Sequence, residues 1–401
     1  MGFNPFNEKG MPAEKQIHSW SKMNVKPYDK NDVHPYTRTR IIFMNGIETE
    51  GAIFSHQFHR HTDDMELRRK LALSRRVEQQ QQKMINWLIP PDETVLEATI
   101  GYEQVAVDLT AFLARTEPDQ YVKAALDFAL LEDFDHLYRY ANLLNMTQGK
   151  AASEITGQYT EITVGRPTIA EHRFPFDDVR KFYNSSSADC LTKLHVLTIT
   201  AAEQQTMNFY MNVGNRPHEM VGRGLYLEIA EIEEQHVTHY GSLADPRASW
   251  FEMLVLHEYN ECWLYHSLMQ DEPDSYVKKI WEDHLEMEIE HLNIARKLML
   301  QYENKDPIEM FPDSMPAPLK FQSNIDYVRD ILESQTDFNA NGTEFIPGDR
   351  MPSDSKYSMY QNAVNQGGVP SEQVIEQHKS KKGEEYRQEL RGKHPVKRFQ
   401  K

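Results

Sequence analysis

Apolar residues recur at helical spacing in two long blocks of the chain, at about residues 38–145 and 189–303. Within each block they return every three or four positions, as in helices that bury one face. The helix breakers fall between these segments, for example at Pro90-Pro91 and at Glu117-Pro118-Asp119, and they divide each block into four. The pattern therefore predicts an all-α protein with two tandem four-helix bundles.

The remaining stretches are polar and lack this periodicity. Residues 1–37 read as an N-terminal arm, and residues 146–188, which contain Gly, Pro and Ser, as a connector. Residues 304–401 form a Pro/Gly/Ser-rich C-terminal tail. The tail has one short amphipathic segment, with apolar residues at Ile325, Val328, Ile331 and Leu332.

The two helical blocks are copies of one another. An offset of 155 residues aligns them without a gap, so that EPDQYVK from Glu117 falls on EPDSYVK from Glu272. The same offset places Asp133 to His136 on Glu288 to His291. This period is too long for a solenoid repeat of about 20–50 residues, and it indicates the duplication of a whole small domain.

A second repeat lies inside each block, where an acid is followed 30 residues later by another acid and three residues after that by His or Gln. The first acids are Glu48, Glu103, Glu203 and Glu258, the second acids are Glu78, Asp133, Glu233 and Glu288, and the third positions are Gln81, His136, His236 and His291. Each half of a block is thus predicted to be a helical hairpin of the same design.

The spacing of the acid and the histidine has a chemical meaning. Residues i and i+3 share one face of a helix, so Glu233 and His236 can bind the same ion. The acids also stand within the apolar stripes, as Glu233 does between Ile229 and Tyr240. Burying several carboxylates together costs several kcal/mol per ion unless cations compensate for their charge. Two acids from two helices and Glu-x-x-His from two others is the pattern of carboxylate-bridged di-metal bundles.

With these motifs the sequence resembles the ferritin-like superfamily over about residues 41–144 and 189–303. The resemblance implies a di-metal site in the second bundle, with two iron ions, or manganese, or a mixed manganese/iron pair. It implies that Glu233 and Glu288 bridge the metals, that Glu203 and Glu258 are terminal ligands, and that His236 and His291 complete the two coordination spheres.

One further acid, Glu261, lies three residues after Glu258 on the same stripe. An extra Glu at this position resembles rubrerythrins, which reduce peroxide. The resemblance implies a non-haem di-iron oxidoreductase of peroxidase or oxidase type, with Glu261 as a catalytic residue and further metal ligand. The two cysteines, Cys190 and Cys262, cannot form the four-cysteine rubredoxin domain that rubrerythrins usually carry. Electrons would then come from a separate donor, such as a rubredoxin-like or flavin protein.

The first bundle departs from this pattern. Gln81 replaces a histidine, Asp133 replaces a glutamate, and Ala106 stands where the second block has Glu261. We expect this bundle to be mainly a scaffold. Its alternative is a second, degenerate metal site, because hard cations accept ligand sets made of oxygen alone. The residues of that site would be Glu48, Glu78, Gln81, Glu103, Asp133 and His136.

Three other functions fit the same motifs. One is a di-iron oxygenase acting on an organic substrate, and another is a ferritin-like protein that oxidises or stores iron without turnover. The third is a scaffold protein whose metal sites are structural. The helix topology is also open: an up-down-up-down bundle is compatible with the short loop between Tyr240 and Trp250, and so is pairing of hairpins between the two blocks.

Composition limits the partners. The formal charge of −17 argues against nucleic acid and anionic membranes, and no apolar run reaches the ~18 residues of a membrane span. Two cysteines and a polar N-terminus without a signal-peptide pattern favour a cytoplasmic protein. Long polar arms beside a compact core suggest a homodimer.

Overall fold

The computed structural model describes residues 2–401, so that Met1 of the predicted arm lies outside the described residues. These residues form fourteen α-helices and one antiparallel hairpin of two short strands, β1 (Phe338–Asn341) and β2 (Glu344–Pro347). The prediction of an all-α protein is confirmed. No helix in the described part of the chain is long and apolar enough to cross a membrane.

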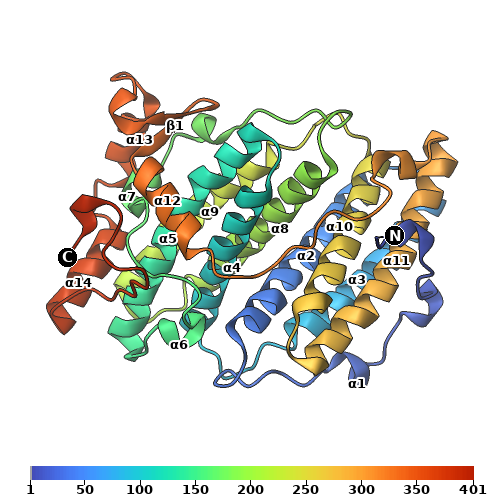
Figure 1. Cartoon of the computed structure of the whole chain (residues 1–401), viewed down its shortest axis with the longest axis horizontal. Coiled ribbons are helices and arrows are strands. Elements are labelled where there is room, and N and C mark those ends of the chain that lie inside the picture. The colour runs from blue at the N-terminus through green and yellow to red at the C-terminus, as the bar shows by residue number, and fades with distance from the viewer. Residues whose placement is uncertain (1) are drawn as a thin grey trace. The chain divides into compact units, whose positions relative to one another are not determined.

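Eight long helices correspond to the eight predicted segments (Figure 1). They are α2 (Pro35–Arg60), α3 (Met65–Asn86), α4 (Val95–Thr116), α5 (Gln120–Gln148), α8 (Cys190–Val213), α9 (Met220–Gly241), α10 (Trp250–Asp271) and α11 (Ser275–Glu303). The duplication is visible in their N-caps. Thr94 and Ser249 each form a capping box, and Asp119 and Asp274 each accept two backbone N–H groups.

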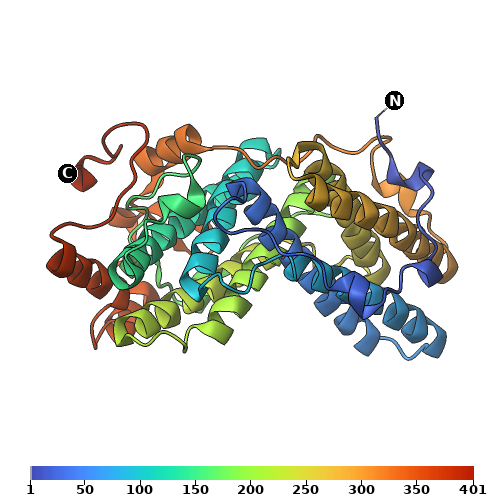
Figure 2. The same ribbon diagram turned by 90° about the horizontal axis from the view of Figure 1, so that it is seen from below.

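The chain divides into two compact units that differ from the predicted tandem bundles. Unit 1 comprises residues 2–92, 183–201 and 244–320, and unit 2 comprises residues 93–182, 202–243 and 321–401. The hairpin of α2 and α3 therefore joins that of α10 and α11, while α4 and α5 join α9 and the second half of α8. Within unit 1, Figures 1 and 2 show α2, α3, α10 and α11 side by side. The expected division into bundles at 38–145 and 189–303 is wrong, and the pairing of hairpins between the blocks is found.

Contacts between the hairpins explain this partnering. In unit 1 the Phe54 ring on α2 stacks on His257 of α10 at 4.1 Å. In unit 2 Tyr102 on α4 stacks on Phe209 of α8 at 4.2 Å. All four hairpins share one hydrophobic pattern, so periodicity predicts the hairpins but not their partners. The partners depend on side chains that differ between the copies, because close packing is sensitive to single atoms.

The N-terminal arm is ordered against unit 1. It contains η1 (Pro5–Asn7), η2 (Ala13–Lys15) and the short helix α1 (Trp20–Met23). At Gly10 the backbone passes so close to α11 that a Cβ atom would lie 2.3 Å from the backbone nitrogen of Glu290. The N–H of Met11 then donates to the carbonyl of Glu286 at 2.7 Å. The arm therefore covers α11, which brings its residues near the core of the unit.

The connector and the tail contain more structure than the sequence pattern indicates. The connector holds α6 (Ser153–Thr156), α7 (Thr168–Glu171) and η3 (Pro175–Asp178). The predicted amphipathic segment is α12 (Ile325–Gln335), with all four of its apolar residues buried. The tail also forms η4 (Pro307–Met310), η5 (Gly348–Arg350), α13 (Lys356–Val364), α14 (Pro370–Lys382) and η6 (Lys397–Phe399).

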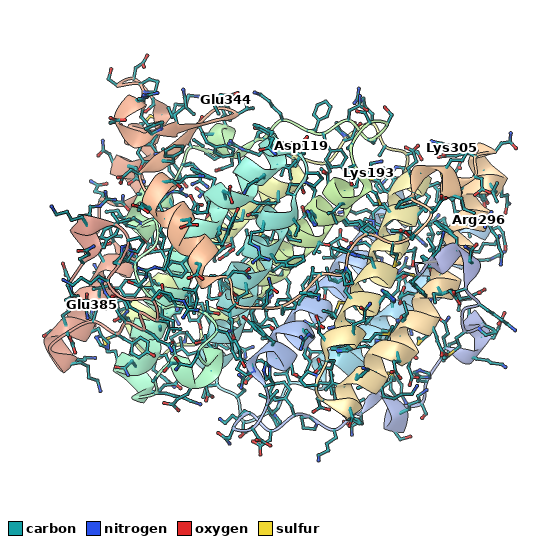
Figure 3. All side chains as sticks on the ribbon, in the orientation of Figure 1. Asp119, Lys193, Arg296, Lys305, Glu344 and Glu385 are labelled. Carbon is teal, nitrogen blue, oxygen red and sulfur yellow. The ribbon has the colours of Figure 1, made fainter. Side chains whose placement is uncertain are left out.

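Two contacts fix this tail locally. The labelled Arg296 on α11 pairs with Asp306, the N-cap of η4, at 2.7 Å (Figure 3). In unit 2, α14 packs against α5 and α9, and the buried Arg139 of α5 donates to the carbonyl of Ser371 at 3.1 Å. The Pro/Gly/Ser-rich tail at residues 304–401 thus contains more helices than the one amphipathic segment that its sequence predicts. A few buried apolar side chains and caps suffice to order a segment that is polar on average.

Candidate metal centres

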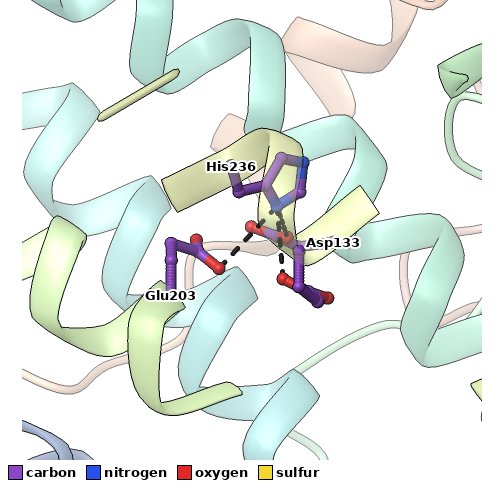
Figure 4. A group of neighbouring side chains, drawn as sticks. Asp133, Glu203 and His236 are labelled. Carbon is purple, nitrogen blue, oxygen red and sulfur yellow. Dashed lines mark ion pairs between the residues drawn. The ribbon is translucent and has the colours of Figure 1, made fainter. Parts of the chain in front are cut away.

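Unit 2 contains a buried group of three acids and a histidine at its centre. Asp133, Glu203, Glu233 and His236 offer ligand atoms that all lie within 4.8 Å of one another. The Nδ1 atom of His236 is 3.2 Å from Asp133 Oδ1, 3.7 Å from Glu203 Oε2 and 3.4 Å from Glu233 Oε2. Figure 4 shows the Asp133 and Glu203 side chains pointing toward this histidine.

A second group in unit 2 shares one residue with the first. Glu103, His136 and Glu233 also place ligand atoms within 4.8 Å of one another. The Nδ1 atom of His136 lies 3.1 Å from Glu233 Oε1. Because Glu233 belongs to both groups, it stands where a bridging carboxylate of a metal pair would stand. Each of the four helices α4, α5, α8 and α9 contributes to this centre.

In the candidate centre of unit 2, both histidines have their outer ring nitrogen Nε2 next to a carboxylate. His136 Nε2 is 2.9 Å from Glu171 Oε2, and His236 Nε2 is 2.9 Å from Glu132 Oε2. Arg166 and Arg173 hold Glu132 in turn, with Arg166 donating at 2.8 Å. A histidine whose Nε2–H is bound to a carboxylate presents Nδ1 to the opposite side. This is the usual support of a metal-ligating histidine.

Unit 1 carries the corresponding centre. Glu78, Glu258 and His291 form one group of potential ligands, and Glu48, Glu261 and Glu288 form another. Glu288 Oε2 lies 3.0 Å from His291 Nδ1, so it joins the two groups. The helices α2, α3, α10 and α11 supply these six residues. Glu288 thus occupies the bridging position, as Glu233 does in unit 2.

The centre in unit 1 has an amide where unit 2 has its second histidine. Gln81 donates through Nε2 to Glu288, and its buried Oε1 has no hydrogen-bond partner. The remaining histidine, His291, meets the neutral Gln16 of the N-terminal arm, with Nε2 2.7 Å from Gln16 Oε1. The histidine of unit 1 is therefore supported by an amide, and those of unit 2 by carboxylates.

A glycine accommodates the extra acid of unit 1. A Cβ atom at Gly51 would lie 2.8 Å from Glu261 Oε1, closer than ordinary contact. Gly51 follows Glu48 by three residues, as Glu261 follows Glu258. The equivalent positions in unit 2 are Thr206 and Ala106. If the hairpins of the second block paired with each other, Glu261 would face Thr206. In the observed pairing it faces Gly51 instead.

Two buried tyrosines link the hairpins at equivalent positions. The hydroxyl of Tyr210 on α8 donates to Glu103 in unit 2, and that of Tyr265 on α10 donates to Glu48 in unit 1. Each tyrosine follows a first acid of the repeat, Glu203 or Glu258, by seven residues. These bonds orient one carboxylate of each centre and leave its second oxygen, Oε2, without a hydrogen-bond partner.

Several carboxylate oxygens in both centres have no hydrogen-bond partner. Buried oxygens without a hydrogen bond occur on Glu78, Asp133, Glu203, Glu258 and Glu261. Such atoms are rare in proteins and each is costly. Burial raises the pKa of Glu203 and Glu258 well above the usual range, and neighbouring carboxylates raise it further. A bound cation would supply the missing partner and favour the ionised form of these acids.

The two acids in the bridging positions have lowered pKa values, unlike the other acids of the two centres. Burial raises the pKa of Glu233, but hydrogen bonds from His136 and His236 outweigh it and hold the value at about 2. Burial also raises the pKa of Glu288, but the charge of His291 and hydrogen bonds, including one from Glu261, lower it overall. The two bridging positions are thus the ones at which a carboxylate is held ionised.

The predicted site residues are all buried in these centres, but they are not grouped as expected. Glu203, Glu233 and His236 lie in unit 2 with Glu103, Asp133 and His136. Glu258, Glu261, Glu288 and His291 lie in unit 1 with Glu48, Glu78 and Gln81. The prediction of one site made only from the second block is wrong, because the hairpins exchange partners. Residues of the first block contribute ligand atoms to both candidate centres, and the expectation that this block is mainly scaffold stays a prediction.

Four supporting residues were not found from the sequence: Gln16, Gly51, Glu132 and Glu171. Glu171 and Gln16 lie in the connector and the arm, where no repeat indicates them. Glu132 directly precedes Asp133, but it does not lie on the helix face of the repeated acid and histidine positions, so the repeat did not indicate it. The contrast of Gly51 with Thr206 was available from the 155-residue offset and could have indicated the position opposite Glu261.

A pocket of about 280 Å³ in unit 1 has His291 of the centre among its lining residues. Helices α3 and α11 form its apolar walls, with Val77 and Leu298 beside the histidine, and the arm contributes Ala13. Lys70 and Lys297 stand among its lining residues. The pocket is slightly below the usual size of sites for drug-sized ligands, about 300–1,000 Å³. The pocket therefore suits a ligand smaller than a typical drug molecule.

No protein-family model, curated protein or solved structure matches this chain.

Proposed function

We propose that this protein is a di-metal oxidoreductase of ferritin-like type with two metal pairs, most simply di-iron, and that it reduces hydrogen peroxide or dioxygen. The observation that carries the proposal is the pair of buried acid and histidine sets with unpartnered ligand atoms. Four acids and two histidines in unit 2, and five acids, one histidine and one glutamine in unit 1, fit the donor preferences of iron and manganese.

The residues of both sets are arranged in a way that would hold metal ions. Glu233 and Glu288 would bridge, because each lies between two groups of ligand atoms. His136, His236 and His291 each present Nδ1 to the carboxylates and have Nε2 bound elsewhere. Bound metal ions would supply electrons and Lewis acidity at these positions.

The reaction with the oxidant belongs to unit 1 in this proposal. Only small molecules suit the pocket at His291, which favours peroxide or dioxygen over a bulky organic substrate. The lining of this pocket carries charges of both signs, from Lys70 and Lys297 and from Glu14 and Glu290. Unit 2, with its two carboxylate-supported histidines, is proposed as a second metal pair of different redox properties.

Glu261 is the proposed proton donor of the unit 1 centre. Burial raises the pKa of Glu261 well above its usual range, and the neighbouring Glu288 charge raises it further. In the absence of a bound cation these effects favour the protonated form of Glu261, which shares a hydrogen bond with Glu288. Reduction of one peroxide to two water molecules consumes two electrons and two protons. Glu261 can deliver one proton at its carboxyl group and then, once ionised, balance an increased charge at the centre.

Oxidation kinetics test this function. The protein is purified without oxygen, loaded with ferrous iron and mixed with peroxide or air in a stopped-flow instrument. We expect rapid oxidation by peroxide. The Glu261→Ala variant should keep its metal but lose at least about tenfold in the rate with peroxide relative to dioxygen, in the range that general acids contribute. Glu286→Ala, which removes an exposed acid from α11, is the matched control.

Three results separate the alternatives. A wild-type protein that binds no metal contradicts the proposed function altogether. Iron that accumulates far beyond two pairs per chain without catalytic turnover supports a storage protein. If Glu261→Ala keeps the wild-type ratio of the two rates, the proton-donor role of Glu261 is wrong and a generic oxidase remains.

A further inference from the structure

A groove of about 680 Å³ lies in unit 1 between the N-terminal arm and the outer face of α3. Trp20 of α1 and Trp87, the C-cap of α3, stand among its lining residues with exposed fractions of 85% and 48%. The arm is fixed here by a hydrogen bond of 2.7 Å from the His18 backbone N–H to Gln80 Oε1. The groove thus presents two accessible indole rings from two elements that are joined to one another.

The charges in this groove are opposite to those of the chain. Arg76 and Lys83 line it, and no acidic side chain does. The whole protein carries a formal charge of −17, so a cationic groove without a carboxylate is a local exception. Among residues 2–401, the Arg76 guanidinium makes no hydrogen bond or ion pair, and Lys83 donates only to its neighbour Gln82. Both cations are therefore available to an anion.

Two indoles and two cations define the chemistry of the ligand. Exposed tryptophans stack on flat apolar rings, and an arginine binds phosphate through two N–H groups. The volume lies within the range of sites for small molecules and cofactors. We propose that this groove binds a planar heteroaromatic ligand with a phosphate group, of the flavin mononucleotide class. The ring would lie at Trp20 and Trp87, and the phosphate at Arg76 and Lys83.

The position of the groove gives the ligand a role. Its lining residues Gln79 and Gln80 lie between the metal-centre residues Glu78 and Gln81 on the same helix, α3. Glu78 and Gln81 are buried, whereas Gln79 is exposed on the other face. A helix with its side chains is about 10–12 Å across. A flavin in the groove is therefore separated from the centre of unit 1 by no more than about one helix.

This arrangement suits the delivery of electrons to unit 1, a role that rests on the proposed function. A reduced flavin anion would give up two electrons and one proton and become oxidised flavin. One electron would reach each of two oxidised metal ions, and the proton would pass to solvent. The transfer therefore balances with a single flavin per metal pair, and the bound flavin is reduced again by an external two-electron donor of the nicotinamide class.

Calorimetry with the full chain tests the binding site without reference to catalysis. Flavin mononucleotide and riboflavin are titrated into the protein as purified, and again after removal of metal by a chelator. We expect flavin mononucleotide to bind at one site in both forms. Trp20→Ala should weaken both flavins about 3- to 10-fold, as expected for a lost aromatic contact. Arg76→Gln should weaken flavin mononucleotide about tenfold and leave riboflavin unchanged.

Matched controls remove similar side chains elsewhere. Arg69→Gln changes another exposed arginine of α3, and Phe176→Ala removes an exposed aromatic residue in unit 2. Both should bind flavin as the wild type does. If the wild type binds no flavin mononucleotide, or if Trp20→Ala and Arg76→Gln bind it as tightly as the controls, the proposal is overturned.

The same samples keep this inference distinct from the proposed function. Metal content is measured in parallel, so that flavin binding to a protein without metal supports the ligand site while the proposed function fails. In the iron-loaded protein, reduction by pre-reduced flavin mononucleotide should slow at least about fivefold in Trp20→Ala, whereas reduction by dithionite should not change. Equal slowing with both reductants would contradict delivery through the groove.

Discussion

Replacing Gly51 by alanine tests whether this glycine exists to accommodate Glu261. The new Cβ would lie 2.8 Å from Glu261 Oε1, and ordinary contact begins at 3.4 Å, so the carboxylate must move by about 3.4 − 2.8 = 0.6 Å. Glycine inside a helix is otherwise unfavourable by about 0.8–1.0 kcal/mol relative to alanine. In the absence of Glu261 the substitution should therefore be neutral or stabilising.

A double-mutant cycle separates the two effects. The affinity of the unit 1 centre for ferrous iron is measured by competition with a chelator, in a background where His136→Ala and His236→Ala disable unit 2. We expect Gly51→Ala to weaken this affinity about tenfold when Glu261 is present and less than about twofold in Glu261→Ala. This difference corresponds to a coupling of about 1 kcal/mol, within the range for residues in contact.

Two outcomes decide this cycle. Equal effects of Gly51→Ala in both backgrounds would refute the reasoning, because the glycine would then be unrelated to the acid. The reverse exchange in unit 2, Ala106→Glu with Thr206→Gly, should be tolerated, whereas Ala106→Glu alone should destabilise the protein. If both variants unfold at the same temperature, the space next to residue 106 does not depend on residue 206.

Two further predictions concern the separate centres. Glu233→Ala and Glu288→Ala should each remove about half of the bound metal, from unit 2 and unit 1 respectively, and elemental analysis that shows complete loss in either single variant would contradict two independent centres. Glu171→Gln should weaken metal binding in unit 2 about 10- to 100-fold, and Gln16→Ala should weaken it in unit 1. Chelator competition measures both, and a change confined to the wrong unit would contradict the assigned support of His136 and His291.

The ligand residues could be predicted from the sequence because their chemistry is local. Glu233 and His236 share a helix face by spacing alone, and their place in an apolar stripe predicts burial. The four-fold recurrence of the motif then indicated a common function for all four hairpins. The structure places every one of these residues in a buried centre.

The partners of the hairpins could not be predicted in the same way. Their shared pattern makes any two hairpins compatible, and the selection rests on contacts such as Gly51 with Glu261 and Tyr265 with Glu48. The supporting groups were missed for a related reason. Gln16 and Glu171 reach the centres from the arm and the connector, where helical segments are too short for periodicity to relate a residue to its position in space.

Anomalous diffraction at the iron edge, from crystals of protein loaded with ferrous iron without oxygen, tests the central claim most directly. We predict two pairs of iron peaks per chain. One pair should lie among Glu103, Asp133, His136, Glu203, Glu233 and His236, and the other among Glu48, Glu78, Glu258, Glu261, Glu288 and His291. Maps without iron at these carboxylates, or with a single pair drawn from residues 203–291 alone, would contradict the account.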